Sequence, residues 1–363
     1  MHYNPTNIFQ LTSVTDSYGR TLTVAYGSNG LISSVTTPDG LVLTYNYTPI
    51  GTGCFGSVLT TVGYPTSPAT SLSYLYEDTS FLNICQLPLT GIIDENGNRF
   101  ATWTYDHTFF IPSATSYQLA GGAGLTKVAY NSILGGPPTV TQVLGVQEVY
   151  KYDFFQDVYP PPHNPAVPIV TEIDRLGTSA VRKFTYDPNG YIASWTDWNG
   201  NLTTFVNNGR GLPKKITEAA GTPLARTTHT TWLSTFHLPA QITEPNRTTV
   251  FTYDANGNVL TKAITAGALT RSFAYTYNAT GQVLTAADPR GNVTSYTYDV
   301  KGNLTSITDA LGHVTSITSY DGAGRPLTAI DPNGVTTSLT YDPRGRLTSQ
   351  TVAALKTPET WSA

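Results

Sequence analysis

Aspartates recur along this chain at a spacing that could align carboxylates for chemistry. Asp288, Asp309 and Asp331 stand 21 and 22 residues apart, and each is followed three residues later by a glycine. A column of carboxylates on neighbouring strands could hold a divalent cation or transfer protons. Whether the carboxylates do either depends on the elements that carry them.

The residues around these aspartates are those of a β-turn. Type I turns favour Asp at the first position, Pro at the second and Gly at the fourth. Residues 187–190, 288–291, 331–334 and 342–345 all satisfy this rule. An aspartate at the first corner of a turn has a structural use, so we interpret the carboxylates as parts of turns.

A tyrosine precedes every second turn. Tyr277, Tyr298, Tyr320 and Tyr341 stand 21, 22 and 21 residues apart, and the residue two places before such a tyrosine is usually large and apolar, with a threonine between. This period of two predicts strands, so each unit of about 21 residues is two strands and two turns. The repeat-turn residues that we single out are Tyr186, Asp187, Gly190, Tyr253, Asp254, Gly257, Tyr298, Asp299, Gly302, Tyr320, Asp321, Gly324, Tyr341, Asp342 and Gly345.

The pattern divides the chain into three regions. Residues 1–50 hold N-terminal repeats, residues 51–173 hold degenerate repeats with loops and Pro/Gly-rich insertions, and residues 174–363 hold a regular array. Within the middle region, residues 76–106 are repeat-like. The turns of the regular array are predicted to begin at Asp174, Asp187, Asp197, Asn207, Glu244, Asp254, Asn278, Asp288, Asp299, Asp309, Asp321, Asp331 and Asp342.

Composition restricts the function classes. The 363 residues carry a formal charge of -4, and only 12% of them are charged, which gives no electrostatic reason to bind nucleic acid or an anionic membrane. The first residues lack a signal-peptide pattern, and no apolar run is long enough to span a membrane. Cys54 and Cys85 have no metal or redox spacing. They could pair if the protein is exported, but we expect two unpaired thiols.

Two motifs could bind ligands but fit loops and turns better. Residues 51–56 satisfy G-x-G-x-x-G, yet a β-branched stretch broken by Gly63 and Pro65 follows where a dinucleotide site needs a helix. Residues 94–98 and 254–258 resemble the opening of a calcium loop. The first of these has Arg99 and Tyr105 where glycine and a carboxylate are required. We expect no bound cofactor.

Residues suited to metal or acid-base chemistry are scattered. Among the histidines, His229 and His237 are the nearest pair, and no third ligand is evident. The adjacent carboxylates at residues 77–78 and 94–95 would point to opposite faces of a strand, which does not suit a general acid and base. The remaining histidines are His2, His107, His163 and His313. We therefore predict no catalytic residue, no metal site and no enzyme.

The repeat resembles the YD repeat of RHS proteins. The stretch YDVKGNLTSITDALGHVTSITSY from Tyr298 carries the pattern most clearly, and residues 76–106 are similar to a recurrent segment of bacterial members. The resemblance covers residues 12–48, 76–106 and 174–351 and is poor over 107–173. Many units agree in register, which makes it specific.

The resemblance implies a fold and a role. RHS and YD-repeat proteins, including the C-component of insecticidal toxin complexes and the extracellular part of teneurins, wind such hairpins into a spiralling antiparallel sheet that forms a hollow β-shell. In bacterial toxins the shell encloses a C-terminal toxic polypeptide. Such a wall also leaves few strand edges open to pairing. The fold class expected here is all-β, with tandem hairpins as part of such a shell.

The sequence departs from bacterial shells at its C-terminal end. Residues 331–334 and 342–345 look like the start of the Asp-Pro-x-Gly core motif, in which aspartates release the toxin, but we interpret both as repeat turns. The chain ends at residues 361–363, where another strand is expected, so it resembles a fragment.

The expected function is a non-enzymatic segment of a polymorphic-toxin shell that encloses a toxin or other polypeptide cargo. Its partners would be the rest of the shell and that cargo, outside the cell or at its surface after export. The alternative is an adhesion or carbohydrate-binding module, in which exposed Trp and Tyr rings stack on sugars.

Overall fold

The computed structural model describes residues 1–107, 112–130, 136–155 and 167–353. Over this part of the chain, thirty β-strands and two short 3-10 helices form. The strands pair antiparallel with their neighbours in the chain, from β1 to β7, from β9 to β22 and from β23 to β30. The all-β, antiparallel fold class is confirmed.

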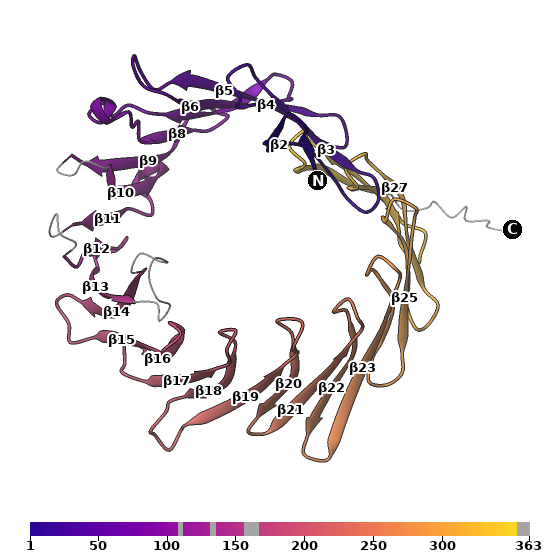
Figure 1. Cartoon of the computed structure of the whole chain (residues 1–363). Coiled ribbons are helices and arrows are strands. Elements are labelled where there is room, and N and C mark those ends of the chain that lie inside the picture. The colour runs from indigo at the N-terminus through magenta and orange to yellow at the C-terminus, as the bar shows by residue number, and fades with distance from the viewer. Residues whose placement is uncertain (108–111, 131–135, 156–166, 354–363) are drawn as a thin grey trace, which may run out of the picture. The chain divides into compact units, whose positions relative to one another are not determined.

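The strands are short and follow one another as hairpins (Figure 1). The first fifteen are β1 His2–Asn4, β2 Asn7–Thr15, β3 Thr21–Tyr26, β4 Ile32–Thr36, β5 Val42–Pro49, β6 Ser57–Tyr64, β7 Thr70–Leu75, β8 Gly91–Ile93, β9 Arg99–Asp106, β10 Ser113–Leu119, β11 Thr126–Ala129, β12 Thr139–Thr141, β13 Gln147–Phe155, β14 Val167–Arg175 and β15 Val181–Tyr186. The next fifteen are β16 Ile192–Thr196, β17 Leu202–Asn207, β18 Pro213–Glu218, β19 Arg226–Trp232, β20 Pro239–Glu244, β21 Arg247–Tyr253, β22 Val259–Ala266, β23 Leu269–Tyr277, β24 Val283–Ala287, β25 Val293–Tyr298, β26 Leu304–Thr308, β27 Val314–Tyr320, β28 Pro326–Ile330, β29 Thr336–Tyr341 and β30 Leu347–Ala353. The 3-10 helices are η1 Leu82–Ile84 and η2 Ala120–Gly122.

The chain divides into two compact units. Unit 1 consists of residues 1–77, 92–99 and 274–363, and unit 2 of residues 78–91 and 100–273. Unit 1 therefore combines the first repeats of the chain with the last. The predicted three regions differ from this division because they follow repeat regularity rather than contacts, and they stay a prediction.

Each strand that ends in the repeat tyrosine carries a register shift at that residue. In the pairing of β25 with β26, Thr297 lies opposite Ser306 and Tyr298 lies opposite Leu304. Thr305 is therefore an extra residue in β26, with no residue of β25 directly opposite it. The same shift occurs before Tyr26, Tyr186, Tyr253, Tyr277 and Tyr341. A bulge of this kind turns the bulged strand locally and re-aims the side chain beside it.

Hydroxyl groups line one face of the hairpins. Cross-strand bonds link Thr252 with Thr261 and Thr276 with Thr285, both at 2.6 Å between hydroxyl oxygens. Few apolar side chains are buried over the described residues; the buried ones are Val24, Val62, Phe81, Ala101 and Ile173. The strands are therefore held together by ladder and side-chain hydrogen bonds more than by a thick apolar core.

Two predicted turn positions are wrong by one residue. The turn expected at Asn207 begins at Asn208, since the Gly211 amide donates to the Asn208 carbonyl, and the turn expected at Asp174 begins at Arg175. Asn207 and Asp174 instead end β17 and pair within β14. In both cases a polar residue that looked like a turn corner is still paired within a strand.

The expectation of unpaired thiols is also wrong. Neither Cys54 nor Cys85 is a free thiol, and each is disulfide-bonded. The distance between cysteines along a chain does not give their distance in space, on which pairing depends. Three positions named from the sequence lie outside the described residues: the prolines at 160–162 in the Pro/Gly-rich middle region, His163 and the terminal residues 361–363.

Candidate functional site

Each repeat aspartate accepts hydrogen bonds from its own turn. Asp299 Oδ1 accepts from the backbone N–H of Lys301 and of Asn303, both at 2.8 Å, and its Oδ2 accepts from the Asn303 amide at 2.9 Å. The Gly302 N–H donates to the Asp299 carbonyl at 3.0 Å. Gly302 has a φ of +75°, which glycine adopts without strain. Asp187, Asp254, Asp321 and Asp342 accept the same two backbone bonds.

These bonds favour the ionised carboxylate. The side-chain amide of Asn292 lowers the pKa of Asp288, and the His313 ring lowers the pKa of Asp309. At Asp16 the lowering of the pKa is due chiefly to the Arg20 guanidinium. A proton acceptor for catalysis needs a pKa raised toward neutrality, so these carboxylates are suited to structure.

The repeat tyrosine joins each hairpin to the one before it. Tyr298 donates its hydroxyl to the Val283 carbonyl at 2.9 Å, and Tyr253 donates to the Pro239 carbonyl at 2.8 Å. The same bond is made by Tyr26, Tyr105, Tyr130, Tyr186, Tyr320 and Tyr341. Trp232 and Asn207 occupy the tyrosine position in two other hairpins. The Trp232 indole N–H donates to the Pro213 carbonyl, and the Asn207 side-chain amide donates to the Ile192 carbonyl.

The turns form two classes that lie at opposite ends of the strands. Tyrosine turns follow the repeat tyrosine and include residues 27–30, 278–281, 299–302, 321–324 and 342–345. Alternate turns lie between them and include residues 16–19, 37–40, 288–291, 309–312 and 331–334. Because consecutive strands run antiparallel, the two classes cannot share one end of the array.

Within unit 1, N-terminal alternate turns pack on C-terminal tyrosine turns. Figure 1 shows β2 and β3 beside β27, and the side-chain contacts below join the same parts of the chain. We call this the turn contact; it comprises the alternate turns 16–19 and 37–40 against the tyrosine turns 278–281, 299–302 and 321–324. Residues far apart in the sequence of unit 1 meet in the turn contact.

Tyr18 forms the first part of the turn contact. Its hydroxyl donates to Gln282 Oε1 at 2.7 Å and is hydrogen-bonded to the Thr280 hydroxyl. Its ring covers Gly302 so closely that a Cβ there would lie 2.4 Å from two ring carbons. Gly302 thus serves both the turn and the surface on which Tyr18 packs.

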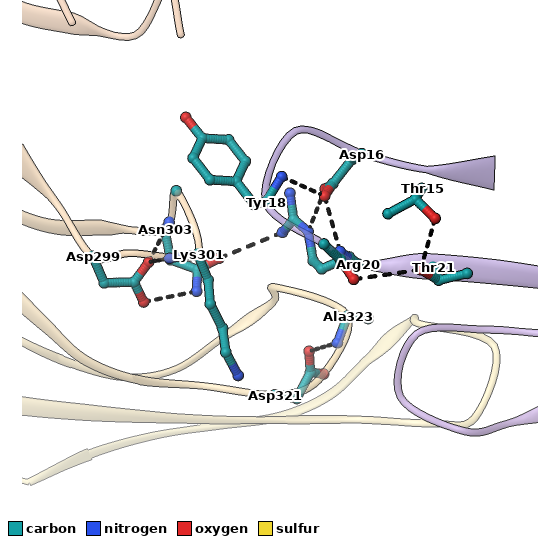
Figure 2. Close-up of polar contacts among 12 residues, drawn as sticks. Thr15, Asp16, Tyr18, Arg20, Thr21, Asp299, Lys301, Asn303, Asp321 and Ala323 are labelled. Atoms are coloured by element: carbon teal, nitrogen blue, oxygen red, sulfur yellow. Dashed lines mark hydrogen bonds and ion pairs between the residues drawn. The ribbon is translucent and has the colours of Figure 1, made fainter. Parts of the chain in front are cut away.

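Arg20 forms the second part. Its Nε donates to Asp16 Oδ2 at 2.7 Å, and its Nη1 lies 3.5 Å from Oδ1 of the buried Asn303, as Figure 2 shows. A Cβ on Gly324 would lie 2.2 Å from that Nη1. The guanidinium therefore fits only because position four of this turn has no side chain.

Asp39 and Arg325 form the third part. Arg325 Nη2 lies 2.8 Å from Asp39 Oδ2, while its Nε lies 2.6 Å from Asp321 Oδ2. A Cβ on Gly322 would lie 3.0 Å from the Asp39 Cα. The side chains of Asp39 and Arg325 are only 14% and 25% exposed, so water screens this pair less than a surface pair.

Arg344 adds a contact beside the turn contact. Its guanidinium forms an ion pair with Glu95 and lies over the Tyr64 ring, 4.3 Å from the centroid. A cleft nearby is lined by Thr37, Pro38, Asp39, Leu41, Leu43, Tyr64, Ala323, Arg325, Pro343 and Arg344. The charged groups of the cleft already pair with one another or with Glu95 and Asp321, which suits packing between the turns.

Sequence reasoning missed the turn contact, although one signal was present. Gly322 occupies position two of its turn, where the other tyrosine turns of unit 1 have serine, alanine, valine or proline. The φ of Gly322 is not in the left-handed region, so turn geometry does not require glycine there. The residue is explained by the close approach of Asp39.

The other sequence-selected polar residues lie in turns, strands and ion pairs. Arg99 donates to both carboxylate oxygens of Glu77, at 3.0 and 2.8 Å, and Asp94 caps its own turn. His229 lies in β19 opposite Thr243, whereas His237 lies in the turn before β20. Over residues 1–107, 112–130, 136–155 and 167–353, no three His, Cys, Asp or Glu side chains are grouped to hold a metal ion.

The G-x-G-x-x-G stretch at residues 51–56 is a turn and loop. Gly53 and Gly56 have φ of +85° and +120°, and the strand β6 follows. A dinucleotide site would place the pyrophosphate at a helix N-terminus, which this stretch does not precede.

Tryptophan rings contact protein groups. The Arg175 guanidinium lies 4.1 Å from the centroid of Trp198, and Trp103 packs on Tyr117 with centroids 5.3 Å apart. Arg175 in turn lies 3.3 Å from the buried Glu148. Trp198 and Trp103 are thus each packed against another side chain of the protein.

The tyrosine and alternate turns agree with a known family pattern. Residues 277–318 and 320–356 match the family described as RHS Repeat. This chain carries RHS repeats. The matched RHS repeats include the tyrosine turns that Tyr18, Arg20 and Asp39 contact. No curated protein sequence matches the chain.

Solved structures share the fold of these RHS repeats. The crystal structures of TcdB2-TccC3 and of TcdB2-TccC3-Cdc42 are each 16% identical to the chain and cover 92% of it, with TM-scores of 0.64 and 0.63. The Photorhabdus luminescens Tc holotoxin pore carrying the mutation TccC3-D651A is 15% identical over 92% of the chain, with a TM-score of 0.51. The chain covers 20%, 20% and 21% of these three chains, so it spans about a fifth of their length.

The described residues include no helix that is both long and apolar enough to cross a membrane.

Proposed function

We propose that the chain is a non-enzymatic wall segment of an RHS-type shell that surrounds a polypeptide cargo. The observation that carries the proposal is the turn contact, where the first repeats of the chain pack on the last repeats through Tyr18, Arg20 and Asp39. Neighbouring repeats pair through their strands, and repeats distant in sequence pack through their turns. An array with both kinds of contact can extend in two directions. Such an array is suited to enclosing another molecule.

The chemistry of the repeats supports a structural role. Carboxylates such as Asp288 and Asp309 have lowered pKa values and are occupied by their own turns. The tyrosine hydroxyls are occupied by backbone carbonyls of the preceding hairpin. The aspartates that could have served chemistry, and the repeat tyrosines with them, hold the repeats together.

The likeness to TcdB2-TccC3 supports the same role in a toxin assembly. Its partners would then be further shell repeats and an enclosed toxin polypeptide, and its place would be outside the cell or at the cell surface. The disulfide-bonded state of Cys54 and Cys85 supports an oxidising environment. The carbohydrate-binding alternative stays an untested prediction.

The coding sequence on both sides of residues 1–363 tests the proposal first. We expect further YD hairpins and a polypeptide of different composition that could be the cargo. The complete gene product should then protect that polypeptide from proteinase K, whereas the same polypeptide expressed by itself should be digested.

Two results would contradict the proposal. One is digestion of the polypeptide at the same rate with and without the repeats. The other is an enzymatic activity that is lost when Asp or His residues of this chain are substituted while the fold is retained.

A further inference from the structure

Residues 208–273 of unit 2 carry an excess of positive charge that the composition of the whole chain conceals. They include seven of the 20 Lys and Arg residues but only three of the 24 Asp and Glu residues, so their formal charge is +4, while that of the chain is -4. The seven cations are Arg210, Lys214, Lys215, Arg226, Arg247, Lys262 and Arg271. We call residues 208–273 the basic stretch. A charge asymmetry of this kind within one chain attracts anionic partners.

Most cations of the basic stretch have no carboxylate partner. Over the parts of the chain that the structure describes, only Arg226 and Arg247 among the seven form ion pairs, and both pair with Glu244. The basic stretch therefore keeps positive charge that no carboxylate of the described structure neutralises.

Arg226 and Arg247 reach one carboxylate from two different strands. Arg226 Nη2 lies 2.7 Å from Glu244 Oε1, and Arg247 Nε lies 2.6 Å from Glu244 Oε2, with Arg247 Nη2 on the same oxygen. Glu244 ends β20 directly opposite Arg247, which begins β21. The hydrogen bond from Arg247 is the main cause of the lowered pKa of Glu244, so this carboxylate is ionised. The three side chains together therefore carry one positive charge.

A cleft of about 520 Å³ opens beside these side chains, and we call it the Glu244 cleft. It is lined by Arg226, Glu244, Pro245, Asn246, Arg247 and Ala266. The Glu244 side chain is only 13% exposed, whereas those of Arg226 and Arg247 are 55% and 54% exposed. Nε and Nη1 of Arg226 and Nη1 of Arg247 have no acceptor among the described residues. The guanidiniums thus keep unused donors in the planar arrangement that suits a carboxylate or a phosphate.

The lining of the Glu244 cleft favours a carboxylate over a nucleic acid. None of its described lining residues is aromatic, although sites for single-stranded nucleic acid stack bases on aromatic rings. Both guanidiniums are already arranged around a carboxylate, that of Glu244. One net positive charge also suits one monovalent group better than a run of phosphates.

We propose that the Glu244 cleft binds a carboxylate side chain of an acidic polypeptide, which shares Arg226 and Arg247 with Glu244. The other cations of the basic stretch add long-range attraction, which speeds encounter and is screened by salt. Glu244 orients the two guanidiniums and also competes for them. The proposal rests on the charges of unit 2 alone, so it does not depend on the shell function proposed above.

Fluorescence anisotropy of a labelled glutamate-rich peptide, titrated with the whole chain at low ionic strength, tests the proposal. The peptide should bind, and added salt should weaken its binding. A glutamine-rich peptide of the same length should not bind. Arg226→Gln and Arg247→Gln should each weaken binding by about threefold or more, because each variant removes a charged donor.

Glu244→Gln separates binding from a purely structural ion pair. Glutamine keeps the size of the side chain and an oxygen that accepts from the guanidiniums, but it removes the competing charge. Binding of the glutamate-rich peptide should therefore tighten by about threefold or more. Circular dichroism checks that the variants keep the wild-type strand content. If Glu244→Gln loses it, the two arginine variants decide the question.

Arg346→Gln is the matched control. Arg346 pairs with one carboxylate, that of Asp342, at 2.7 Å, and its side chain is 64% exposed. It lies in unit 1, outside the basic stretch. The control removes the same charge from the chain as Arg226→Gln does, and it should bind the peptide like the wild type.

Each of several results would overturn the proposal. A wild-type chain that does not bind the glutamate-rich peptide would do so, as would equal weakening by Arg226→Gln and Arg346→Gln. A folded Glu244→Gln variant that binds no more tightly than the wild type would show that Glu244 does not compete for the guanidiniums. Tighter binding of an oligothymidylate of equal charge would assign the cleft to nucleic acid instead.

Discussion

Asp39 and Arg325 lie 286 positions apart in the chain, yet their side chains form an ion pair of 2.8 Å. The pair joins an alternate turn of the first repeats to a tyrosine turn of the last. Arg325 also holds Asp321 of its own turn at 2.6 Å, so its guanidinium is oriented before it meets Asp39. This relationship makes the strength of the turn contact measurable.

A double-mutant cycle at Asp39 and Arg325 should give a coupling free energy of about 1–3 kcal/mol. The coupling free energy measures the hydrogen bond between the two side chains, which is charge-assisted and partly buried. The cycle uses Asp39→Ala, Arg325→Ala and the double variant, with the free energy of unfolding measured in urea. It cancels the separate loss of the Arg325 contact with Asp321. A coupling energy indistinguishable from zero would mean that the pair does not stabilise the turn contact.

Gly322→Ala should destabilise the protein by about 1–3 kcal/mol because its Cβ would press on the backbone of Asp39. Gly209→Ala is the control. Gly209 also occupies position two of a turn, at residues 208–211, and its Cβ would meet no atom within 4 Å. Thermal unfolding compares the two variants, and equal effects would show that close approach is not what requires glycine at position 322.

Tyr298→Phe should lower the free energy of unfolding by about 0.5–1.5 kcal/mol, because it removes the bond to the Val283 carbonyl and keeps the ring. Tyr296→Phe on the same strand is the control, since the Tyr296 hydroxyl makes no hydrogen bond within the described structure. Chemical denaturation is the measurement. If both variants lose equal stability, the hydrogen bond from Tyr298 to the Val283 carbonyl of the preceding hairpin contributes nothing specific.

Acid should destabilise the turns. The Asn292 side chain holds the pKa of Asp288 below its ordinary value of 3.8, so the stabilisation is present above that value and is lost as pH falls through the lower folded pKa. Asp288→Asn should reduce the loss on acidification, because Asn278 shows that asparagine caps such a turn equally, accepting from Thr280 and Gln282. Unfolding measured from pH 5 to pH 2 tests this; an unchanged acid dependence contradicts it.

High pH should destabilise the hairpins that the repeat tyrosines join. Burial raises the pKa of Tyr253 and Tyr298 above the ordinary value of 10.0. Stability from these groups is therefore complete below that value and is lost as pH rises through the folded pKa. Tyrosinate absorbance should appear at higher pH in the native chain than in the denatured chain. Identical titration curves for the two states would contradict the expected burial.

Strands and most turns could be predicted from sequence because their causes are local. The alternation around Tyr298 and Thr297 determines a strand, and Asp299 with Gly302 determines the turn that follows, through bonds that span no more than four residues. Where the local signal was ambiguous, prediction failed by one residue. Asn207 looked like a turn corner but takes the tyrosine position of its hairpin.

The sequence by itself therefore determined an array of antiparallel hairpins and the structural use of its aspartates. Only the tertiary structure decided that Tyr18 packs on Gly302, that Asp39 meets Arg325 and that neither cysteine is a free thiol. The physical reason is range: turn and strand energies depend on neighbouring residues, whereas these contacts depend on how repeats distant in sequence come together in space.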